Sequence, residues 1–355
     1  MKNKPNILVI NPGSTSTKAA LFKGEENFKN IEVSHDTEVL RKYGPVIRQV
    51  EFRYALINNF VKKNILADEI DAIIGRGGLL KPLKGGVYKV NKGMLYDLSR
   101  SRYGEHACNL GAVLAAKFSK ILKKPAFIAD PVTVDEIAPE ARITGSLLFK
   151  KVSVFHALNQ KSIAKRYGQD IGKPYEKLNL IVVHIGGGIS VGSHLKGRVV
   201  DVNNALEEGP FTPERSGSLP MGQLVKMCFS GKYREEEVLK LLVGKGGLFS
   251  HLGTSDCRAV EQRILKGDKK AKIVFEAMGY GIAKGIGAAA AVLKGDVDAV
   301  LLTGGGARSH LLVNYIRQRV KFIAPVKVYA GENEMSSLAA GVIRVLTGKE
   351  KVRAY

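Results

Sequence analysis

Three short turns carry the residue types that bind phosphate groups, and each turn follows an apolar run. They are Asn11–Lys18 (NPGSTSTK), His184–Ser190 (HIGGGIS) and Thr303–Ser309 (TGGGARS). Glycine lets a ligand approach the bare backbone, and backbone N–H groups together with small hydroxyls can hold a phosphate. The third turn leads into a predicted helix, whose N-terminus favours anions. The first turn is not a Walker A loop, because the GxxxxGK[ST] pattern is absent. One such turn is equally typical of a plain connection between strands, but three of them in one chain favour a nucleotide site.

Four further side chains could handle anions or a metal ion. Arg76 directly follows the apolar run 72–75, and Asp130 directly follows the run 126–129. In α/β proteins the ends of strands face ligand crevices. Taken singly, an arginine or an aspartate is more often part of a surface ion pair, and a histidine at the start of a helix can serve only as a cap. The four side chains are Arg76, Asp130, His156 and Arg215.

The elements that must position these residues form a mixed α/β pattern. Aliphatic and β-branched runs bounded by Gly, Pro or Asn predict strands, and longer amphipathic runs predict helices. The predicted strands are 7–10, 18–22, 72–75, 126–129, 180–184, 189–194, 199–202, 299–303 and 326–329. The predicted helices are 46–63, 106–122, 156–166, 271–293, 311–322 and 336–346.

The order strand, small-residue turn, strand occurs twice, at 7–22 and again at 180–194. A repeated unit of this kind predicts two similar domains with a cleft between them. A chain of 355 residues also fits two domains of about 150–180 residues each. We place the first domain at 1–152, completed by a C-terminal helical segment at about 336–355, and the second domain at 153–335.

The composition argues against several classes of protein. The net charge is +22, but the basic residues are scattered and tryptophan is absent, which describes a solvated surface that attracts anionic metabolites better than a nucleic-acid-binding face. Three distant cysteines support neither a disulfide framework nor a zinc site, and they fit a reducing cytosol. The run 7–10 is too short for a signal peptide, and lysines interrupt the alanine-rich stretch after Gly279. We therefore expect a cytoplasmic protein that binds neither nucleic acid nor membrane.

At these residues the sequence resembles the acetokinase family of the actin-like ATPase superfamily, over nearly the whole chain. The resemblance implies an α/β fold of two ribonuclease H-like domains, and it is strongest for the branch of the family that phosphorylates butyrate. One departure is Gly187, which stands where members that act on acetate carry Asn, so that a side-chain contact to phosphate is replaced by backbone contacts. Besides the three turns, the resemblance rests on the runs 75–82, 104–111, 129–136, 155–160 and 209–217.

The resemblance implies that ATP phosphorylates a short-chain carboxylate by direct in-line transfer, giving an acyl phosphate and ADP. A carboxylate is already ionised at neutral pH, so the reaction needs positioned cations rather than a general base. By resemblance, Arg76 and Arg215 hold the carboxylate and the phosphoryl oxygens, and His156 donates a hydrogen bond to the phosphoryl group in transfer. Asp130 and Glu334 would organise Mg²⁺, with Glu332 as the alternative to Glu334.

The same resemblance assigns the nucleotide to the three turns and to one loop. For Asp256 and Arg258, a helix cap followed by a solvated arginine is an equally good interpretation. The residues assigned to the β- and γ-phosphates are Asn11, Ser14, Ser16, His184, Gly186, Gly187 and Gly188. Those assigned to the α-phosphate and the adenosine are Gly304, Gly305, Gly306, Asp256 and Arg258.

Two alternatives remain open at this point. A neighbouring acid (isobutyrate, propionate or acetate) could be the substrate, because each methylene buried in the acyl pocket changes the free energy of binding by only about 0.8 kcal/mol. A non-metabolic actin-like ATPase switch is the other, although such a switch needs no carboxylate-binding arginines. The family resemblance also implies a homodimer or a larger homo-oligomer.

Overall fold

The computed structural model describes residues 4–331 and 333–355. Its contacts divide the chain into two compact units. Residues 4–135 and 333–355 form the first unit, and residues 136–331 form the second. Glu332, the sequence-based alternative for the metal, lies outside the described residues.

The first unit is built on a six-stranded sheet with the order β3-β2-β1-β4-β6-β5. The strands β1, β2 and β3 pair antiparallel as a meander, whereas β4 is parallel to β1 and β6 is parallel to β4. Alternate residues of β1 face opposite sides of the sheet, and both sides are apolar and buried, so helices can cover each face. The strands are β1 (Asn6–Pro12), β2 (Ser16–Lys23), β3 (Glu26–Ser34), β4 (Ala72–Arg76), β5 (Val87–Lys89) and β6 (Ala126–Ala129).

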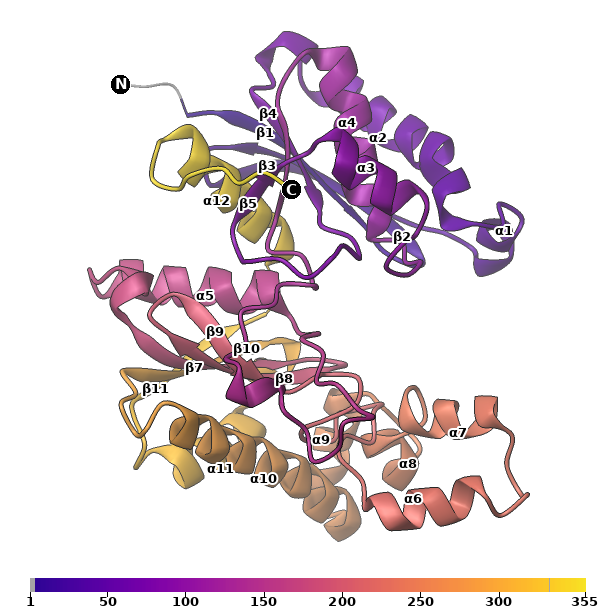
Figure 1. Ribbon diagram of the computed structural model, residues 1–355, viewed down its shortest axis with the longest axis vertical. Helices are drawn as coiled ribbons and strands as arrows, with labels where there is room; N and C mark the ends of the chain where they lie inside the picture. The colour runs from indigo at the N-terminus through magenta and orange to yellow at the C-terminus, as the bar shows by residue number, and fades with distance from the viewer. Residues whose placement is uncertain (1–3, 332) are drawn as a thin grey trace. The chain divides into compact units, whose positions relative to one another are not determined.

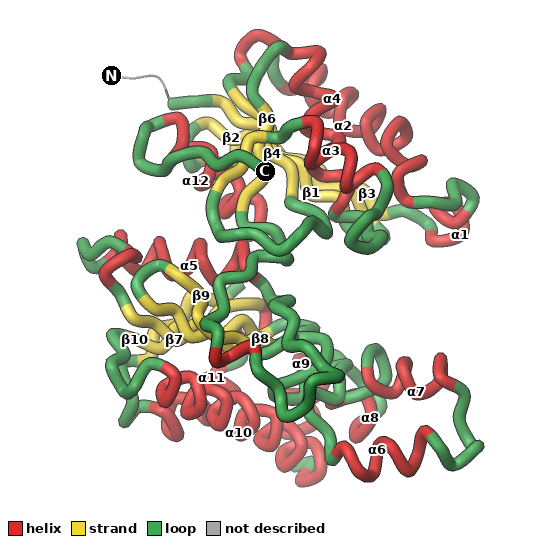
Figure 2. Tube along the Cα trace, viewed as in Figure 1, coloured by secondary structure: helices red, strands yellow, loops and turns green. Residues whose placement is uncertain are grey.

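Helices cover both faces of this sheet (Figures 1 and 2). One face packs Leu8 and Ile10 against Ile57 of α2 and Leu114 of α4. The C-terminal helix α12 packs on β1 and β4. A Cβ at Gly75 of β4 would lie 2.0 Å from the carbonyl oxygen of Gly111, so this pair of glycines lets α4 rest directly on the strand. The helices are α1 (Thr37–Arg41), α2 (Val50–Asn64), α3 (Lys92–Ser99), α4 (Asn109–Leu122) and α12 (Glu334–Leu346).

The second unit repeats this plan on a five-stranded sheet with the order β11-β10-β7-β8-β9. Its first three strands again pair antiparallel, and β10 and β11 join in parallel on the other side of β7. The strand order counted along each unit therefore begins in the same way, which is the duplication that the repeated strand-turn-strand pattern predicts. The strands are β7 (Asn179–Ile185), β8 (Ile189–Leu195), β9 (Arg198–Val202), β10 (Ala299–Gly304) and β11 (Val326–Ala330).

Two apolar layers sandwich this second sheet. Ile181 and Val183 of β7 pack with α10 and α11 on one face, whereas Leu180 and Val182 pack with α5 on the other (Figure 1). No helix of the described residues is both long and apolar enough to cross a membrane. The helices are α5 (Ala157–Asp170), α6 (Met221–Cys228), α7 (Glu235–Leu242), α8 (Gly247–Leu252), α9 (Cys257–Leu265), α10 (Lys269–Val292) and α11 (His310–Val320).

The residues that follow Asp135 join the second unit, whereas the sequence-based boundary was placed at 152. Glu136 accepts hydrogen bonds from Lys161 Nζ (2.8 Å) and Val199 N (3.0 Å). The Ala138 N–H donates to Val200 O at 2.8 Å. These contacts tie an extended segment to the edge strand β9 and to α5, and no local pattern in the sequence indicates them.

Each predicted strand and helix is present, but several elements were missed. The predicted helix 46–63 is a 3₁₀ turn at Val46–Gln49 followed by α2, and the predicted helix 106–122 begins only at Asn109. The strand β3 was missed because its sequence, ENFKNIEVS, is mostly polar and exposed. The helices α6–α9 were missed because each is short, at six to nine residues, and buries few of them.

Candidate functional site

In the first unit, three predicted site residues lie at one edge of the sheet. Asn11 is the penultimate residue of β1, Arg76 is the last residue of β4, and Asp130 follows β6. These strands are parallel neighbours in register at their carboxyl ends. This is the edge at which open α/β sheets bind their ligands.

Glu334, the first residue of α12, joins two of these side chains. Its Oε2 accepts a hydrogen bond from Asn11 Nδ2 at 2.7 Å and one from Arg76 Nη1 at 3.0 Å. Both ion-pair side chains keep about a quarter of their surface exposed, at 29% for Arg76 and 25% for Glu334. Among the described residues, the buried Oδ1 of Asn11 has no hydrogen-bond partner. A buried, unpartnered acceptor fits a cation or a bound water, because it otherwise bears the full cost of desolvation.

Asp130 is buried, and it adopts a left-handed backbone conformation with φ of 37°. Its Oδ1 accepts a hydrogen bond from the Gly86 N–H at 2.7 Å. The carboxylate therefore anchors the loop before β5, a structural role that the sequence did not indicate. No cluster of three or more His, Cys, Asp or Glu side chains suited to a metal occurs in the described part of the chain.

The first turn, Asn11–Lys18, contacts a buried cation. Arg53 of α2 is fully buried, and its Nη1 donates to Ser16 O at 2.6 Å and to Thr17 Oγ1 at 3.1 Å. Burial lowers the pKa of Arg53 to about 10. Ser14 is exposed at the tip of the turn, with its Oγ 3.4 Å from His106 Nε2. Neither Arg53 nor His106 was singled out from the sequence, because each contact joins segments far apart in the chain.

In the second unit, the two glycine turns lie beside each other. His184 of β7 is paired with Thr303 of β10, so the turns that follow these strands leave the same edge of the sheet. Gly304 has φ of 87°, and a Cβ there would lie 2.4 Å from Ile185 O, so only glycine fits this position. Gly305 and Gly306 then form a 3₁₀ turn rather than the start of α11, which begins at His310.

Arg215 and His156 both lie over the middle turn. A Cβ at Gly188 would lie 2.5 Å from Arg215 Nη1 and 3.2 Å from His156 Cε1. Thr212 Oγ1 donates to Gly187 O at 2.6 Å and accepts from the Arg215 N–H, and so it ties the arginine loop to the turn. The guanidinium of Arg215 donates through Nη1 to Ala205 O at 2.8 Å. Its Nε is buried and has no partner among the described residues.

Burial lowers the pKa of Arg215, against the opposing field of Glu214. An arginine remains charged at neutral pH even so. The result is a half-buried cation with an unused donor, held beside a glycine turn. Such an arrangement binds an anion whose oxygens can reach the guanidinium and the backbone together.

His156 stands at the N-cap position of α5, but its side chain makes no capping hydrogen bond. Its ring stacks on that of His184, with centroids 3.8 Å apart and planes 12° apart. His156 Nδ1 lies 2.9 Å from Ser190 Oγ, and His184 Nδ1 lies 2.9 Å from Asn159 Oδ1. The helix-cap interpretation left open by the sequence therefore does not account for His156.

Asp256 does cap a helix, which is the simpler of its two interpretations. Its Oδ1 accepts hydrogen bonds from Arg258 N at 2.8 Å and Ala259 N at 3.4 Å. The Arg258 side chain is exposed. These contacts assign neither residue to a ligand.

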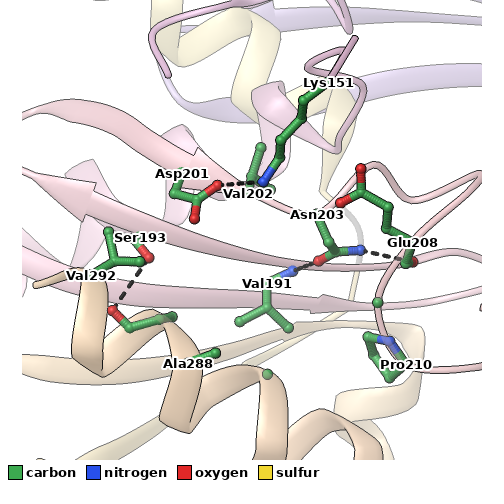
Figure 3. A pocket seen from close by; sticks show the side chains of 13 residues that line it. Lys151, Val191, Ser193, Asp201, Val202, Asn203, Glu208, Pro210, Ala288 and Val292 are labelled. Carbon is green, nitrogen blue, oxygen red and sulfur yellow. Dashed lines mark hydrogen bonds and ion pairs between the residues drawn. The ribbon is translucent and has the colours of Figure 1, made fainter. Parts of the chain in front are cut away.

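A separate cavity of about 220 Å³ opens between β8, β9 and α10 (Figure 3). Lys151 and Asp201 form an ion pair of 2.7 Å at its mouth, and Pro210 lines it. Neither His156 nor Arg215 lines this cavity.

One prediction arises from the buried histidine His194, which is bonded to Gln160 and Tyr175. Burial lowers the pKa of His194 well below its usual value of about 6.5, with a smaller contribution from Lys161. Below pH 6.5, His194 is therefore protonated in the unfolded chain but stays neutral in the folded chain. The free energy of unfolding should be constant above this pH and fall below it, by at most about 1.4 kcal/mol per pH unit for this group.

Urea titrations between pH 5 and pH 8 measure this effect. His194→Gln removes the titrating group, so its stability should depend less steeply on pH below 6.5 than that of the parent protein. Parallel pH profiles for the two proteins would assign the acid sensitivity to other groups.

The chain is similar to known proteins in sequence and in fold. The profile of the acetokinase family matches residues 147–345. Butyrate kinase 2 of Clostridium acetobutylicum is 49% identical over 354 residues, covering 99% of this chain and 99% of that protein. Butyrate kinase 1 of the same organism is 50% identical over 351 residues, covering 98% and 99%. The crystal structure of Porphyromonas gingivalis acetate kinase superposes with a TM-score of 0.78 at 20% identity, covering 96% of this chain and 100% of that one. The fold is thus the pair of actin-like α/β domains that the sequence predicts.

Proposed function

Because this chain belongs to the acetokinase family and is a carboxylate kinase, we propose that it transfers the γ-phosphoryl group of ATP to butyrate, giving butanoyl phosphate and ADP. The observation that carries the proposal is the placement of Arg215 and His156 over Gly188. Two donors and bare backbone at one point suit a phosphoryl group whose oxygens gain charge during transfer.

The reaction joins two anions, so the dominant requirement is charge neutralisation. At neutral pH the acid is ionised and is itself the nucleophile, and no side chain needs to remove a proton from it. Arg76, at the carboxyl end of β4, is proposed to orient the carboxylate. Arg215 is proposed to hold the phosphoryl oxygens through its unpartnered Nε. His156 adds a hydrogen bond that strengthens as the phosphoryl group moves.

The nucleotide phosphates are proposed to lie on the first turn and on the middle turn. Ser14 and Ser16 offer hydroxyls and backbone N–H groups, and Gly186–Gly188 offer backbone alone. Asn11 differs from the other members of the first turn, because its Nδ2 already donates to Glu334. Its unpartnered Oδ1 fits a cation or a metal-bound water better than a phosphate oxygen.

The residues present fit Mg²⁺, which is bound through one or two carboxylates and keeps several waters. Glu334 and the Asn11 amide oxygen offer hard oxygen donors at one point, and Asp130 is proposed to act through water because its Oδ1 is engaged with Gly86. When bound, Mg²⁺ would neutralise charge on the β- and γ-phosphates. Gly304–Gly306, Asp256 and Arg258 remain proposals for the nucleoside end.

The test is acyl-phosphate formation, trapped as the hydroxamate, with Mg-ATP and acids from acetate to valerate, including isobutyrate. We expect the highest kcat/KM with butyrate and a change of about fourfold for each methylene removed, because a buried methylene changes the free energy by about 0.8 kcal/mol. A maximum at another acid would replace butyrate as the substrate. ATP turnover that is indifferent to every acid would instead favour a nucleotide-driven switch.

Two neighbouring glycines provide a matched pair of variants. A methyl group at Gly188 would meet Arg215 Nη1 at 2.5 Å, whereas one at Gly187 would meet only Glu214 Oε1 at an ordinary 3.4 Å. Gly188→Ala should therefore lower kcat by about 10²-fold by displacing the guanidinium. Gly187→Ala should lower kcat less than tenfold. Steady-state kinetics with butyrate measure both, and equal losses would show that the turn, not the arginine above it, is what the substitutions disturb.

We also propose that the protein is a homodimer or a larger homo-oligomer. The helix α6 buries none of its residues: it exposes Met221 (80%) and Val225 (54%), and Phe229 directly after it is 88% exposed. Light scattering that gives the monomer mass at assay concentration would remove this proposal.

A further inference from the structure

A continuous row of hydrogen bonds leads from the interior of the second unit to His156. Tyr175 Oη lies 2.8 Å from His194 Nδ1, and His194 Nε2 lies 3.0 Å from Gln160 Oε1. Gln160 Nε2 donates to Ser190 Oγ at 2.8 Å and to Ser190 O at 3.0 Å. Ser190 Oγ then lies 2.9 Å from His156 Nδ1. Gln160, Ser190 and His194 are each 0% exposed, so water does not compete for these bonds.

The direction of the row is set at Gln160. Its amide NH₂ faces two acceptors on Ser190, so its carbonyl oxygen is the atom that faces His194. His194 must therefore donate through an Nε2–H. Its ring is neutral because burial holds the pKa of His194 well below the usual value. A neutral ring with a hydrogen on Nε2 accepts a hydrogen bond at Nδ1, and the Tyr175 hydroxyl donates that bond.

The direction continues through Ser190. Its Oγ accepts from Gln160, and in the described part of the chain the other partner of this hydroxyl is His156 Nδ1. A buried hydroxyl hydrogen without an acceptor costs roughly 1–3 kcal/mol. The Ser190 hydrogen is therefore directed at His156 Nδ1, which must accept it. The ring hydrogen of neutral His156 then lies on Nε2.

The stacked partner His184 is fixed in the opposite way. Thr303 Oγ1 donates to Gly331 O at 3.4 Å, so it accepts from Asn159 Nδ2 at 3.3 Å. The Asn159 carbonyl oxygen consequently faces His184 Nδ1 and accepts a hydrogen bond from it. Neutral His184 thus carries its hydrogen on Nδ1. Two parallel rings only 3.8 Å apart are held as opposite tautomers.

From this geometry we propose that Ser190, Gln160 and His194 are positioning residues that hold His156 as its Nε2–H tautomer, so that a neutral imidazole donates to the phosphoryl group. The proposal deepens the proposed function and rests on it only for the identity of the ligand. A neutral donor suits this place because Arg215 already lies beside the ring, and a second positive charge next to it would be costly. A fixed tautomer also avoids reorganisation at the moment of transfer.

The direct test is the nitrogen chemical shifts of the imidazole rings in the full chain, labelled with ¹⁵N-histidine and measured without ligands at neutral pH. His156→Gln and His184→Gln assign the signals. We expect His156 to be protonated at Nε2 and His184 at Nδ1. Protonation of His156 at Nδ1, or an even mixture of its tautomers, would overturn the proposal whatever the enzyme's substrate proves to be.

Two serines of β8 form a matched pair for a functional test. Ser190→Ala removes the hydrogen directed at His156, whereas Ser193→Ala removes a buried hydroxyl that donates to Ala289 O on α10. Ser190→Ala should introduce the second tautomer in the spectrum and lower kcat by about 10- to 100-fold, by analogy with the loss of an outer partner of a metal-bound histidine, with KM for ATP unchanged. Ser193→Ala should leave the His156 signals and kcat as they are. A normal His156 spectrum in Ser190→Ala would contradict the proposal even if kcat fell.

Discussion

Replacing Arg215 with alanine is expected to lower kcat by about 10³-fold with butyrate and ATP at saturation, the effect of removing an arginine from a phosphoryl group in transfer. The loss corresponds to about 4 kcal/mol of transition-state stabilisation. We expect so large an effect because the guanidinium is held in place and still has a donor to offer. Its Nη1 donates to Ala205 O, and its Nε is buried and unpartnered among the described residues. The Nε–H is the donor that we propose a phosphoryl oxygen uses.

The size of the loss separates catalysis from structure. A purely structural Arg215 would contribute one hydrogen bond to a carbonyl, about 1.5–3 kcal/mol of stability, and little to kcat in the folded protein. Arg215→Lys should recover less than a tenth of the activity, because an ammonium cannot reproduce the planar fork. Arg234→Ala is the control, since that arginine is exposed and its one ion pair among the described residues is with Glu237. Stopped-flow or steady-state kinetics on thermally stable variants distinguish a catalytic from a structural role of Arg215. A kcat for Arg215→Ala within threefold of that of the parent protein would exclude Arg215 from the mechanism.

The part of the candidate site that could be predicted from the sequence is the set of residues that follow the strands. A turn of this kind can be predicted from a short stretch of sequence, because an apolar run indicates the strand and the small residues after it indicate the bend. Arg76, Asp130 and the three turns were predicted in this way, and the structure places them where parallel strands end, while their ligand roles stay predictions. The alternation of apolar residues also predicted the repeated sheet that carries them.

The support behind the site was not predictable, because it joins distant and uncharged groups. Ser190 and Gln160 are separated by a strand and a helix, and nothing in either residue type announces a bond to a histidine. Arg53 reaches the first turn from α2 and is fully buried, whereas an arginine in a helical pattern is normally taken as a solvated one. The segment after Asp135 pairs with β9 through backbone atoms, which no side-chain pattern records.

Replacing Arg76 with alanine is expected to lower kcat/KM for butyrate by about 10²- to 10³-fold, mainly through a higher KM for the acid, with KM for ATP little changed. Arg76 pairs with Glu334 at 3.0 Å, so an ion pair that merely holds α12 is the competing explanation. That pair is partly exposed, and pairs of this kind contribute only about 0–1 kcal/mol. Loss of the pair alone would therefore change kcat/KM by less than about tenfold.

A double-mutant cycle with Glu334→Gln decides between the two roles of Arg76. Glu334→Gln keeps the bond to Asn11 Nδ2 through its amide oxygen but removes the charge. Because Glu334 is also proposed to hold Mg²⁺, the double variant Arg76→Ala/Glu334→Gln is compared with Glu334→Gln alone. If Arg76 served only to neutralise Glu334, adding Arg76→Ala to Glu334→Gln would cause no further loss. If Arg76 binds the carboxylate, the double variant stays as poor in butyrate binding as Arg76→Ala. Arg102→Ala is the comparison for an ion pair without a ligand, because Arg102 is more exposed than Arg76 and pairs with Asp97 in the same unit. If Arg76 binds the substrate, Arg76→Ala should lower kcat/KM at least tenfold more than Arg102→Ala does, and this loss should persist in the double variant. A contact to the ligand, unlike a salt bridge, is not relieved when the protein's own carboxylate is removed.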